Sequence, residues 1–227
     1  PSFRQAFVNT IIIAFFKITL SILVPLVLSL MLNEVTKSWF KRSVQTIVFI
    51  PYFFSWAILA GMVLEIFAYD GVINNVLESL FGMEPIAFLV SNKYFRTIVI
   101  GSDVWKGMGY NTVLLLAAIT NVDPTLHEAA QVDGAGRWKQ MLHVTLPGIM
   151  PMVAVLTVLG LGGILNAGFE QILIMYNPTV EKTVDILDTL VYRLGMVSHQ
   201  YSAAAAMGLF KSVISLLFVG TSYWILY

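Results

Sequence analysis

The chain has 227 residues and a formal net charge of zero, because 13 Lys and Arg residues balance 13 Asp and Glu residues. This balance excludes an electrostatic nucleic-acid binder, which needs an excess of cations to contact phosphates. Hydrophobic residues make up 58% of the chain and charged residues only 11%, against roughly 25% charged residues in soluble domains. Such a composition cannot form a water-facing surface and indicates an integral membrane protein.

Five apolar segments are long enough to cross a bilayer, for which a helix needs about 20 mostly apolar residues. They are Phe7–Leu32, Val44–Tyr69, Phe95–Asn121, Gly148–Met175 and Ala203–Tyr227. None alternates with the two-residue period of a membrane strand. We therefore predict an all-α fold, a polytopic transmembrane helical bundle, with residues 1–227 forming a single transmembrane domain.

The connections between these segments set the expected topology. Asn33–Ser43 and Asn121–Pro147 fall on one side, and Asp70–Tyr94 and Tyr176–Ser202 on the other. Each side has five Lys and Arg residues, so the positive-inside count is a tie. Only the density of cations in Asn33–Ser43 favours the first side as cytoplasmic.

The most polar connection, residues 121–147, has the signals of a short helix. Asp123 is a good N-cap, Pro124 loses no hydrogen bond at the first helical position, and Gly134 tolerates a left-handed turn at the end. A second short helix is expected through Trp138, ending before Pro147. On composition alone, this connection is either a docking element or an amphipathic loop that packs on its own bundle.

The order of residues in this connection resembles the EAA loop of binding-protein-dependent ABC importer permeases, which have the MetI-like fold. The matching residues are Glu128-Ala129-Ala130, Asp133-Gly134-Ala135, and Val144-Thr145-Leu146-Pro147. The resemblance implies a cytoplasmic coupling helix that docks on an ATPase subunit, and it thereby settles the orientation. The implied coupling residues are Glu128, Ala129, Ala130, Asp133, Gly134, Ala135 and Trp138.

Other strings, such as Phe49-Ile50-Pro51-Tyr52-Phe53, are similar to permeases for oligosaccharides and polysaccharides. This resemblance implies a subunit in a bacterial inner membrane that transports a saccharide and is not itself an enzyme. It also implies a second homologous permease subunit, two ATPase subunits that bind ATP and Mg²⁺, and an extracytoplasmic solute-binding protein. Such permeases usually have six spans, so we expect the first helix to be missing from this sequence.

Ionisable residues inside the predicted spans must face protein or water, since a charge at the bilayer centre costs at least about 2.5 kcal/mol. They are Lys17, Glu65, Asp103, Lys106, Glu170 and Lys211. On the third span, Asp103, Lys106, Gly107, Tyr110 and Asn111 share one helical face. On the fourth span, glycines at 160, 162 and 163 weaken the helix, after which Asn166 and Glu170 are one turn apart.

The polar and ionisable residues inside the predicted spans have two interpretations. Polar groups that bond hydroxyls and aromatic rings that stack on sugars would form a substrate path. The candidates are Tyr52, Trp56, Asp103, Trp105, Lys106, Tyr110, Asn111, Asn166, Glu170 and Gln171. The alternative is structural: Lys17 and Lys211 pair with acids, and Asp103 and Lys106 neutralise each other.

The sequence contains no group of residues with the spacing of a catalytic site. It has no Cys, three scattered His residues and no Gly-rich phosphate-binding loop, so we expect neither a metal nor a cofactor on this chain. Three alternatives remain open: an importer of a non-sugar solute, an ion-coupled secondary transporter that uses Asp103 or Glu170, and a membrane-embedded enzyme.

Overall fold

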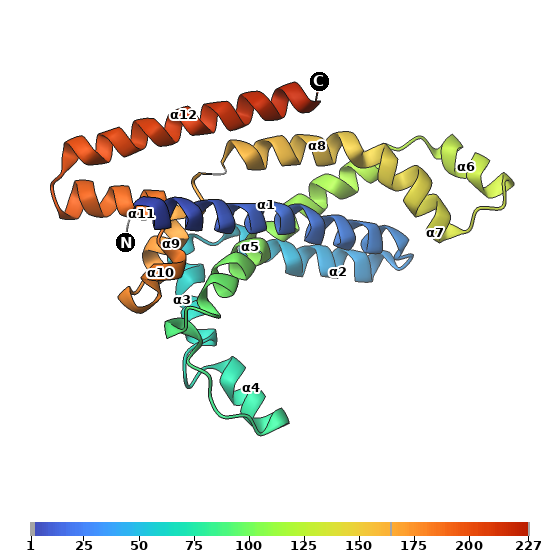
Figure 1. Cartoon of the computed structure of the whole chain (residues 1–227). Coiled ribbons are helices and arrows are strands. Elements are labelled where there is room, and N and C mark those ends of the chain that lie inside the picture. The colour runs from blue at the N-terminus through green and yellow to red at the C-terminus, as the bar shows by residue number, and fades with distance from the viewer. Residues whose placement is uncertain (1–2, 164, 227) are drawn as a thin grey trace.

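A computed structural model describes residues 3–163 and 165–226, and within these ranges the elements are helices. Four long helices dominate the molecule (Figure 1): α1 Phe3–Glu34, α5 Phe95–Thr120, α8 Leu146–Gly162 and α12 Tyr201–Leu226. Helix α5 crosses α1 obliquely and packs closely on it, while α12 lies beside α8. The predicted all-α bundle is confirmed.

Three helical segments of the described chain are long and apolar enough to cross a membrane: Phe3–Glu34, Arg137–Gly162 and Tyr201–Phe218. A fourth, bent segment qualifies if Ser38–Phe53 and Trp56–Ile66 count as one span. Helix α5 is long enough, with 26 residues, but its polar side chains keep it out of this group. Two of the five predicted spans, the second and the fourth, are not single straight helices.

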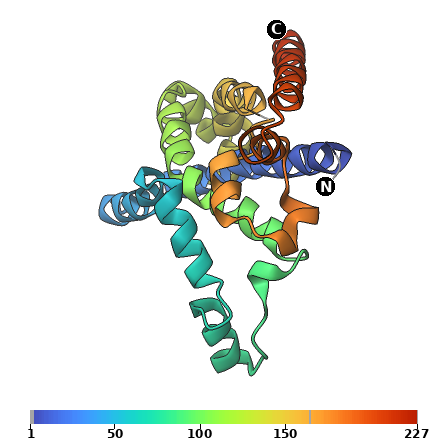
Figure 2. The same cartoon turned by 90° about the vertical axis from the view of Figure 1, so that its left-hand side faces the viewer.

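The second predicted span, Val44–Tyr69, is sharply bent. Helix α2 (Ser38–Phe49) continues into a 3-10 turn, η1 (Ile50–Phe53), and α3 (Trp56–Ile66) then leaves at 109°. Pro51 lies in the turn, where it lacks the N–H that a continuing helix needs, and Phe54 and Ser55 adopt extended backbone angles. Helix α3 and the following α4 (Val72–Phe81) project away from the long helices (Figure 2).

The fourth predicted span, Gly148–Met175, is interrupted. Helix α8 ends at Gly162 and the short helix α9 spans Phe169–Met175. Between them, Ala167 and Gly168 have positive φ angles of 43° and 85°. The glycines weaken the helix as predicted, but Asn166 and Glu170 do not share a helical face, because Asn166 lies before α9 begins.

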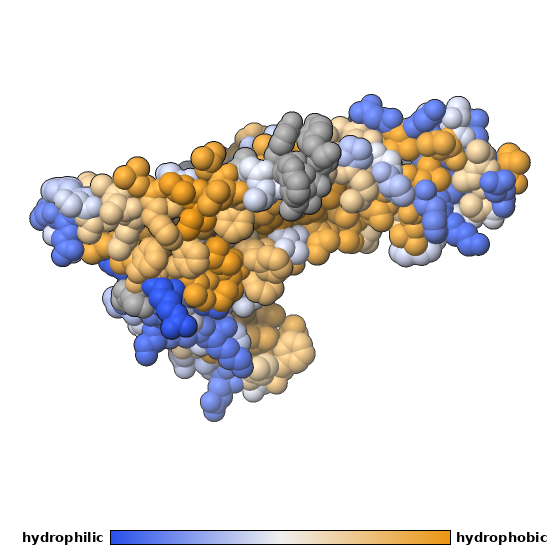
Figure 3. All heavy atoms as spheres, turned by 45° about the horizontal axis from the view of Figure 1, so that its top comes forward, coloured by the Kyte–Doolittle hydropathy of each residue, from blue (hydrophilic) through white to orange (hydrophobic). Residues whose placement is uncertain are grey.

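Hydrophilic side chains gather at the two ends of the molecule, with an apolar band between them (Figure 3). At one end, α6 (Pro124–Val132) and α7 (Arg137–Gln140) lie near the end of α1, where Arg137 approaches Glu34 at 3.9 Å. This arrangement places the connections 33–43 and 121–147 together, as predicted.

The other two predicted connections meet at the opposite end. The first contains α4 and the turn η2 (Phe88–Val90). The second contains η4 (Pro178–Val180), α10 (Glu181–Val184), α11 (Leu187–Tyr192) and η5 (Arg193–Val197). Asn92 donates a hydrogen bond to the Thr179 carbonyl at 3.0 Å, and Asn177 donates one to the Leu89 carbonyl at 3.0 Å. The predicted pairing of connections by side therefore agrees with the structure.

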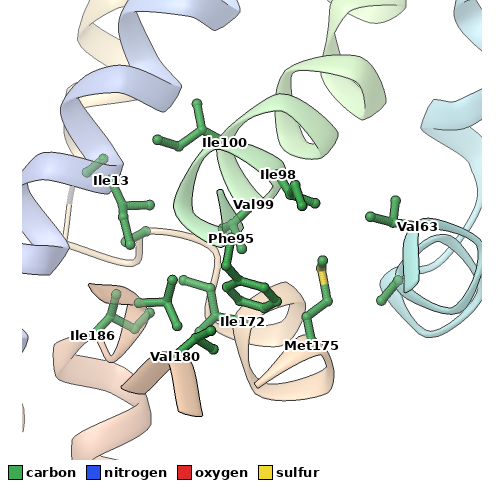
Figure 4. Packing of buried hydrophobic residues seen from close by; sticks show 14 of the residues in the cluster. Ile13, Val63, Phe95, Ile98, Val99, Ile100, Ile172, Met175, Val180 and Ile186 are labelled. Atoms are coloured by element: carbon green, nitrogen blue, oxygen red, sulfur yellow. The ribbon is translucent and has the colours of Figure 1, made fainter. Parts of the chain in front are cut away.

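The largest hydrophobic core joins α1, α5, α9 and the segment 180–186 (Figure 4). Phe95, at the start of α5, is fully buried there with Ile13 and Ile172. Burying each such side chain contributes about 1.5–3 kcal/mol. This core fixes the broken α8–α9 region against α1 and α5.

Candidate functional site

The start of α6 is fixed by its cap. The Asp123 Oδ1 atom accepts a hydrogen bond from the Thr125 amide at 2.9 Å, and this bond lowers the pKa of the Asp123 carboxyl. At the other end, Gly134 has a φ of 75°, and the Ala135 amide donates to the Ala130 carbonyl at 2.8 Å. These bonds satisfy backbone groups at both ends of the helix, as the sequence predicts.

The second short helix differs from the prediction, because it does not end before Pro147. Helix α7 continues through a π-helical turn, η3 (Met141–Thr145), directly into α8. Pro147 has no N–H to donate to the carbonyl four residues earlier. The wider turn accommodates this loss, with the Leu146 amide bonded to the Met141 carbonyl.

The α6–α7 surface is open to a partner. No residue of α6 is buried, and Glu128, Ala129, Asp133 and Gly134 are exposed. Ala130 and Ala135 are half-buried. Val132 is 89% exposed and Trp138 is 70% exposed at this end, where apolar side chains lie among hydrophilic ones (Figure 3). Large exposed apolar side chains beside small ones are typical of a docking surface.

The other candidate region centres on Lys17 of α1, whose side chain is only 7% exposed. Its ammonium group lies 3.2 Å from the Asp103 carboxylate and donates to the Ala167 carbonyl at 3.0 Å and to the Gln171 side-chain oxygen. Gln171, fully buried, donates in turn to Ser102 Oγ at 2.8 Å. This polar cluster ties the α8–α9 break to α1 and α5.

A cleft of about 440 Å³ opens beside this cluster. Of the predicted path residues, Asp103, Tyr110, Asn111 and Asn166 line it, together with residues from α1 and α8. The charged side chains in its lining, Lys17 and Asp103, pair with each other. The sequence did not identify the contribution of α1 or of Gly168 to this cleft, since only folding brings them to α5.

Four of the predicted path residues lie where η1 and the start of α3 meet α5. The Tyr52 and Tyr110 rings stack at 4.8 Å with an interplanar angle of 9°. The Lys106 ammonium lies 5.4 Å from the centre of the Trp56 ring and donates to the Phe54 carbonyl. We call Tyr52, Trp56, Lys106 and Tyr110 the aromatic–lysine group. It adjoins the cleft, because Tyr110 belongs to both.

The remaining candidates lie elsewhere. Trp105 lines a separate, apolar hollow with Phe88 and Tyr94, and Glu170 is exposed on α9. Lys211 bonds Asp188 at 2.6 Å, in agreement with the structural interpretation, whereas Asp103 pairs with Lys17 and not with Lys106. Across residues 3–163 and 165–226, His, Asp and Glu side chains form no group of three that could hold a metal ion.

Comparison with known proteins gives consistent matches. The family described as "Binding-protein-dependent transport system inner membrane component" matches residues 7–225. Protein LplB of Bacillus subtilis is 41% identical over 98% of this chain and 70% of its own length. The polygalacturonan/rhamnogalacturonan transport system permease protein YteP of the same organism is 40% identical over 96% of this chain and 68% of its own length.

Solved structures match along almost the whole chain. A bacterial ABC transporter involved in import of the acidic polysaccharide alginate superposes with a TM-score of 0.95 at 40% identity, covering 99% of this chain and 79% of the matched chain. The alginate transporter in complex with its alginate pentasaccharide-bound periplasmic protein gives a TM-score of 0.94 at 40% identity, covering 98% of this chain and 77% of the matched chain.

Proposed function

We propose, since the chain belongs to the family of inner membrane components of binding-protein-dependent transport systems, that it carries an oligosaccharide or polysaccharide fragment across the membrane. Family membership confirms the expected transport subunit of a bacterial inner membrane and excludes the alternative of an enzyme. The saccharide follows from the relatives, whose names include a polysaccharide permease and an alginate importer.

The observation that carries the proposal is the cleft beside the α8–α9 break, with the aromatic–lysine group at its margin. Asn111 and Asn166 supply amides and Asp103 a carboxylate for hydroxyl groups, and Tyr52, Trp56 and Tyr110 supply flat apolar faces. Gln171 accepts a hydrogen bond from Lys17, and this bond fixes the Lys17 side chain in the lining of the cleft. Trp105 and Glu170 lie outside the cleft, so we leave them out of the proposed path.

The proposed path needs further subunits. The cleft is an open surface of one chain, so a second homologous permease subunit would close it. Two ATPase subunits would bind ATP and Mg²⁺, and one of them would dock on the exposed α6–α7 surface of this chain through Glu128, Ala129, Ala130, Asp133, Gly134, Ala135 and Trp138. An extracytoplasmic solute-binding protein would deliver the saccharide to the opposite end.

An ion-coupled secondary transporter fits less well. Such a carrier needs a carboxylate that is free to bind and release the coupling ion. Asp103 already pairs with Lys17 at 3.2 Å, and Glu170 lies outside the cleft. Asp103 therefore lines the cleft but is already paired, and Glu170 is not placed along it.

The test is saccharide-stimulated ATP hydrolysis by the reconstituted complex with and without Gly134→Val. A β-branched side chain is strained at the φ of 75°, so the end of α6 should shift and stimulation should fall at least about tenfold. Gly136→Ala is the matched control, because Gly136 has a φ of −68° and open space around its Cβ position. Unchanged stimulation in an assembled Gly134→Val complex would contradict the docking role.

A further inference from the structure

Lys106 is a cation near the middle of α5 with no acidic partner in the described part of the chain. The other lysines that the sequence places within spans are neutralised: Lys17 by Asp103 and Lys211 by Asp188. Among residues 3–163 and 165–226, Lys106 forms no ion pair, and its ammonium group has one hydrogen bond, to the Phe54 carbonyl, and one ring contact, with Trp56. A charge within a predicted span requires water or an anion rather than lipid.

The surroundings of Lys106 indicate what kind of anion it receives. Tyr110 follows one turn later on α5, and its ring stacks on Tyr52 while both side chains stay about two-fifths exposed, at 40% and 41%. Flat aromatic surfaces of this kind stack on the apolar faces of sugar rings. Lys106 and Tyr110 are four residues apart on α5 and so are neighbours on one face, which places the Lys106 ammonium on the side where such a ring would stack. A carboxylate on that ring would accept charge-assisted hydrogen bonds from it.

The net charge of the cleft and the aromatic–lysine group also favours an anionic ligand. Because the charges of Lys17 and Asp103 cancel, the cleft and the adjoining aromatic–lysine group together carry one unpaired positive charge. A neutral sugar would leave this charge uncompensated when the path closes around it and water leaves. An acidic sugar would neutralise it.

We propose that Lys106 binds the carboxylate of a uronic-acid residue while Tyr52, Trp56 and Tyr110 hold the sugar ring, so that this subunit selects acidic over neutral saccharides. The inference rests on the proposed function and specifies its substrate class. Two other roles for Lys106 make different predictions: it holds the α2–α3 bend through the Phe54 carbonyl, or it pairs with a carboxylate of the second permease subunit.

The experiment compares uptake of trigalacturonate and of its carboxyl-reduced form, a neutral galactose trimer of the same linkage. Uptake is measured in proteoliposomes that contain the complete importer and its binding protein. The variants are Lys106→Gln, which removes the charge, and Lys106→Arg, which keeps it. The matched control is Lys93→Gln, since Lys93 also lies over an aromatic ring, at 5.0 Å from the centre of Tyr94, but at the outer end of the molecule.

We expect wild type to prefer the acidic trimer. Lys106→Gln should raise the concentration of acidic trimer needed for half-maximal uptake at least about tenfold and leave that of the neutral trimer within about twofold. Lys106→Arg should retain most of the preference, and Lys93→Gln should retain all of it.

Four outcomes overturn the inference. Equal losses for both trimers assign Lys106 to the bend, and loss of the second permease subunit from the purified complex assigns it to a subunit contact. A wild type that prefers the neutral trimer refutes acidic selection while leaving saccharide transport intact. A wild type that takes up neither trimer, nor any other oligosaccharide offered by the binding protein, refutes the proposed function as well.

Discussion

At the scale of single residues, the polar cluster around Lys17 shows how the chain tolerates a charge inside the membrane. The Lys17 ammonium group has three acceptors: the Asp103 carboxylate, the Ala167 carbonyl and the Gln171 side chain. A buried ion pair is costly to desolvate, and additional hydrogen bonds are what make it tolerable. The cluster therefore acts as a connection between segments that are far apart in sequence.

Replacing Lys17 by Met should destabilise the protein by about 3–5 kcal/mol, because it leaves Asp103 and the buried Gln171 without their donor. The readout is the thermal unfolding of the purified complex. Lys37→Met, at an exposed position, is the matched control and should stay within about 0.5 kcal/mol of wild type.

Adding Asp103→Asn to Lys17→Met should recover part of the loss, since the unpaired carboxylate is removed. If the double variant is less stable than Lys17→Met by the full cost of a second independent substitution, the two residues are not coupled and the described cluster is wrong.

At the scale of elements, α5 organises the molecule because small residues let its neighbours approach closely. A Cβ atom at Gly109 would lie 2.4 Å from the Val48 carbonyl and 2.5 Å from the Phe49 Cα atom. Helix α2 thus contacts the α5 backbone directly just before the bend at η1. This contact helps to hold Tyr52 where it stacks on Tyr110.

Gly109→Ala should therefore separate α2 from α5 and destabilise the protein by about 1–3 kcal/mol, the usual cost of overpacking. Gly107→Ala is the control, because it lies two residues away on the same helix and a Cβ there meets nothing within 4 Å. The thermal unfolding temperature should fall for the first variant only. Equal unfolding temperatures for the two variants would show that α2 and α5 are not in direct contact.

Elements were predictable from the sequence where their signals are local. Asp123, Pro124 and Gly134 define α6 within a dozen residues, and the structure has the expected cap and left-handed turn. The glycines of the fourth span indicated a weakened helix, but neither the 109° bend after η1 nor the positive φ angles at Ala167 and Gly168 were predictable, because long apolar composition does not distinguish a straight span from a bent one. The pairing of Lys17 with Asp103 joins residues 86 positions apart, which spacing within one helix cannot reveal.

At the scale of the whole molecule, the two hydrophilic ends are different in character. One end offers the exposed α6–α7 surface, with Trp138 and Val132 free of contacts that would bury them. The other end is bound together by hydrogen bonds between the connections 70–94 and 176–202, and Arg193 holds Asp185 there at 2.6 Å. An exposed surface for an ATPase at one end and a hydrogen-bonded surface for a delivering protein at the other are what the proposed transport cycle needs at opposite sides of the membrane.

This assignment of sides predicts an asymmetry that thiol labelling can measure, because the chain contains no Cys. Ser38 begins α2 at the α6–α7 end, and Ser79 lies on the projecting α4; both are exposed. In intact cells, an impermeant thiol reagent should label Ser79→Cys but not Ser38→Cys. After permeabilisation both variants should react, which verifies that each thiol is accessible, while the Cys-free chain stays unlabelled throughout. Labelling of Ser38→Cys alone in intact cells would reverse the orientation and place the α6–α7 surface outside, where no ATPase could reach it.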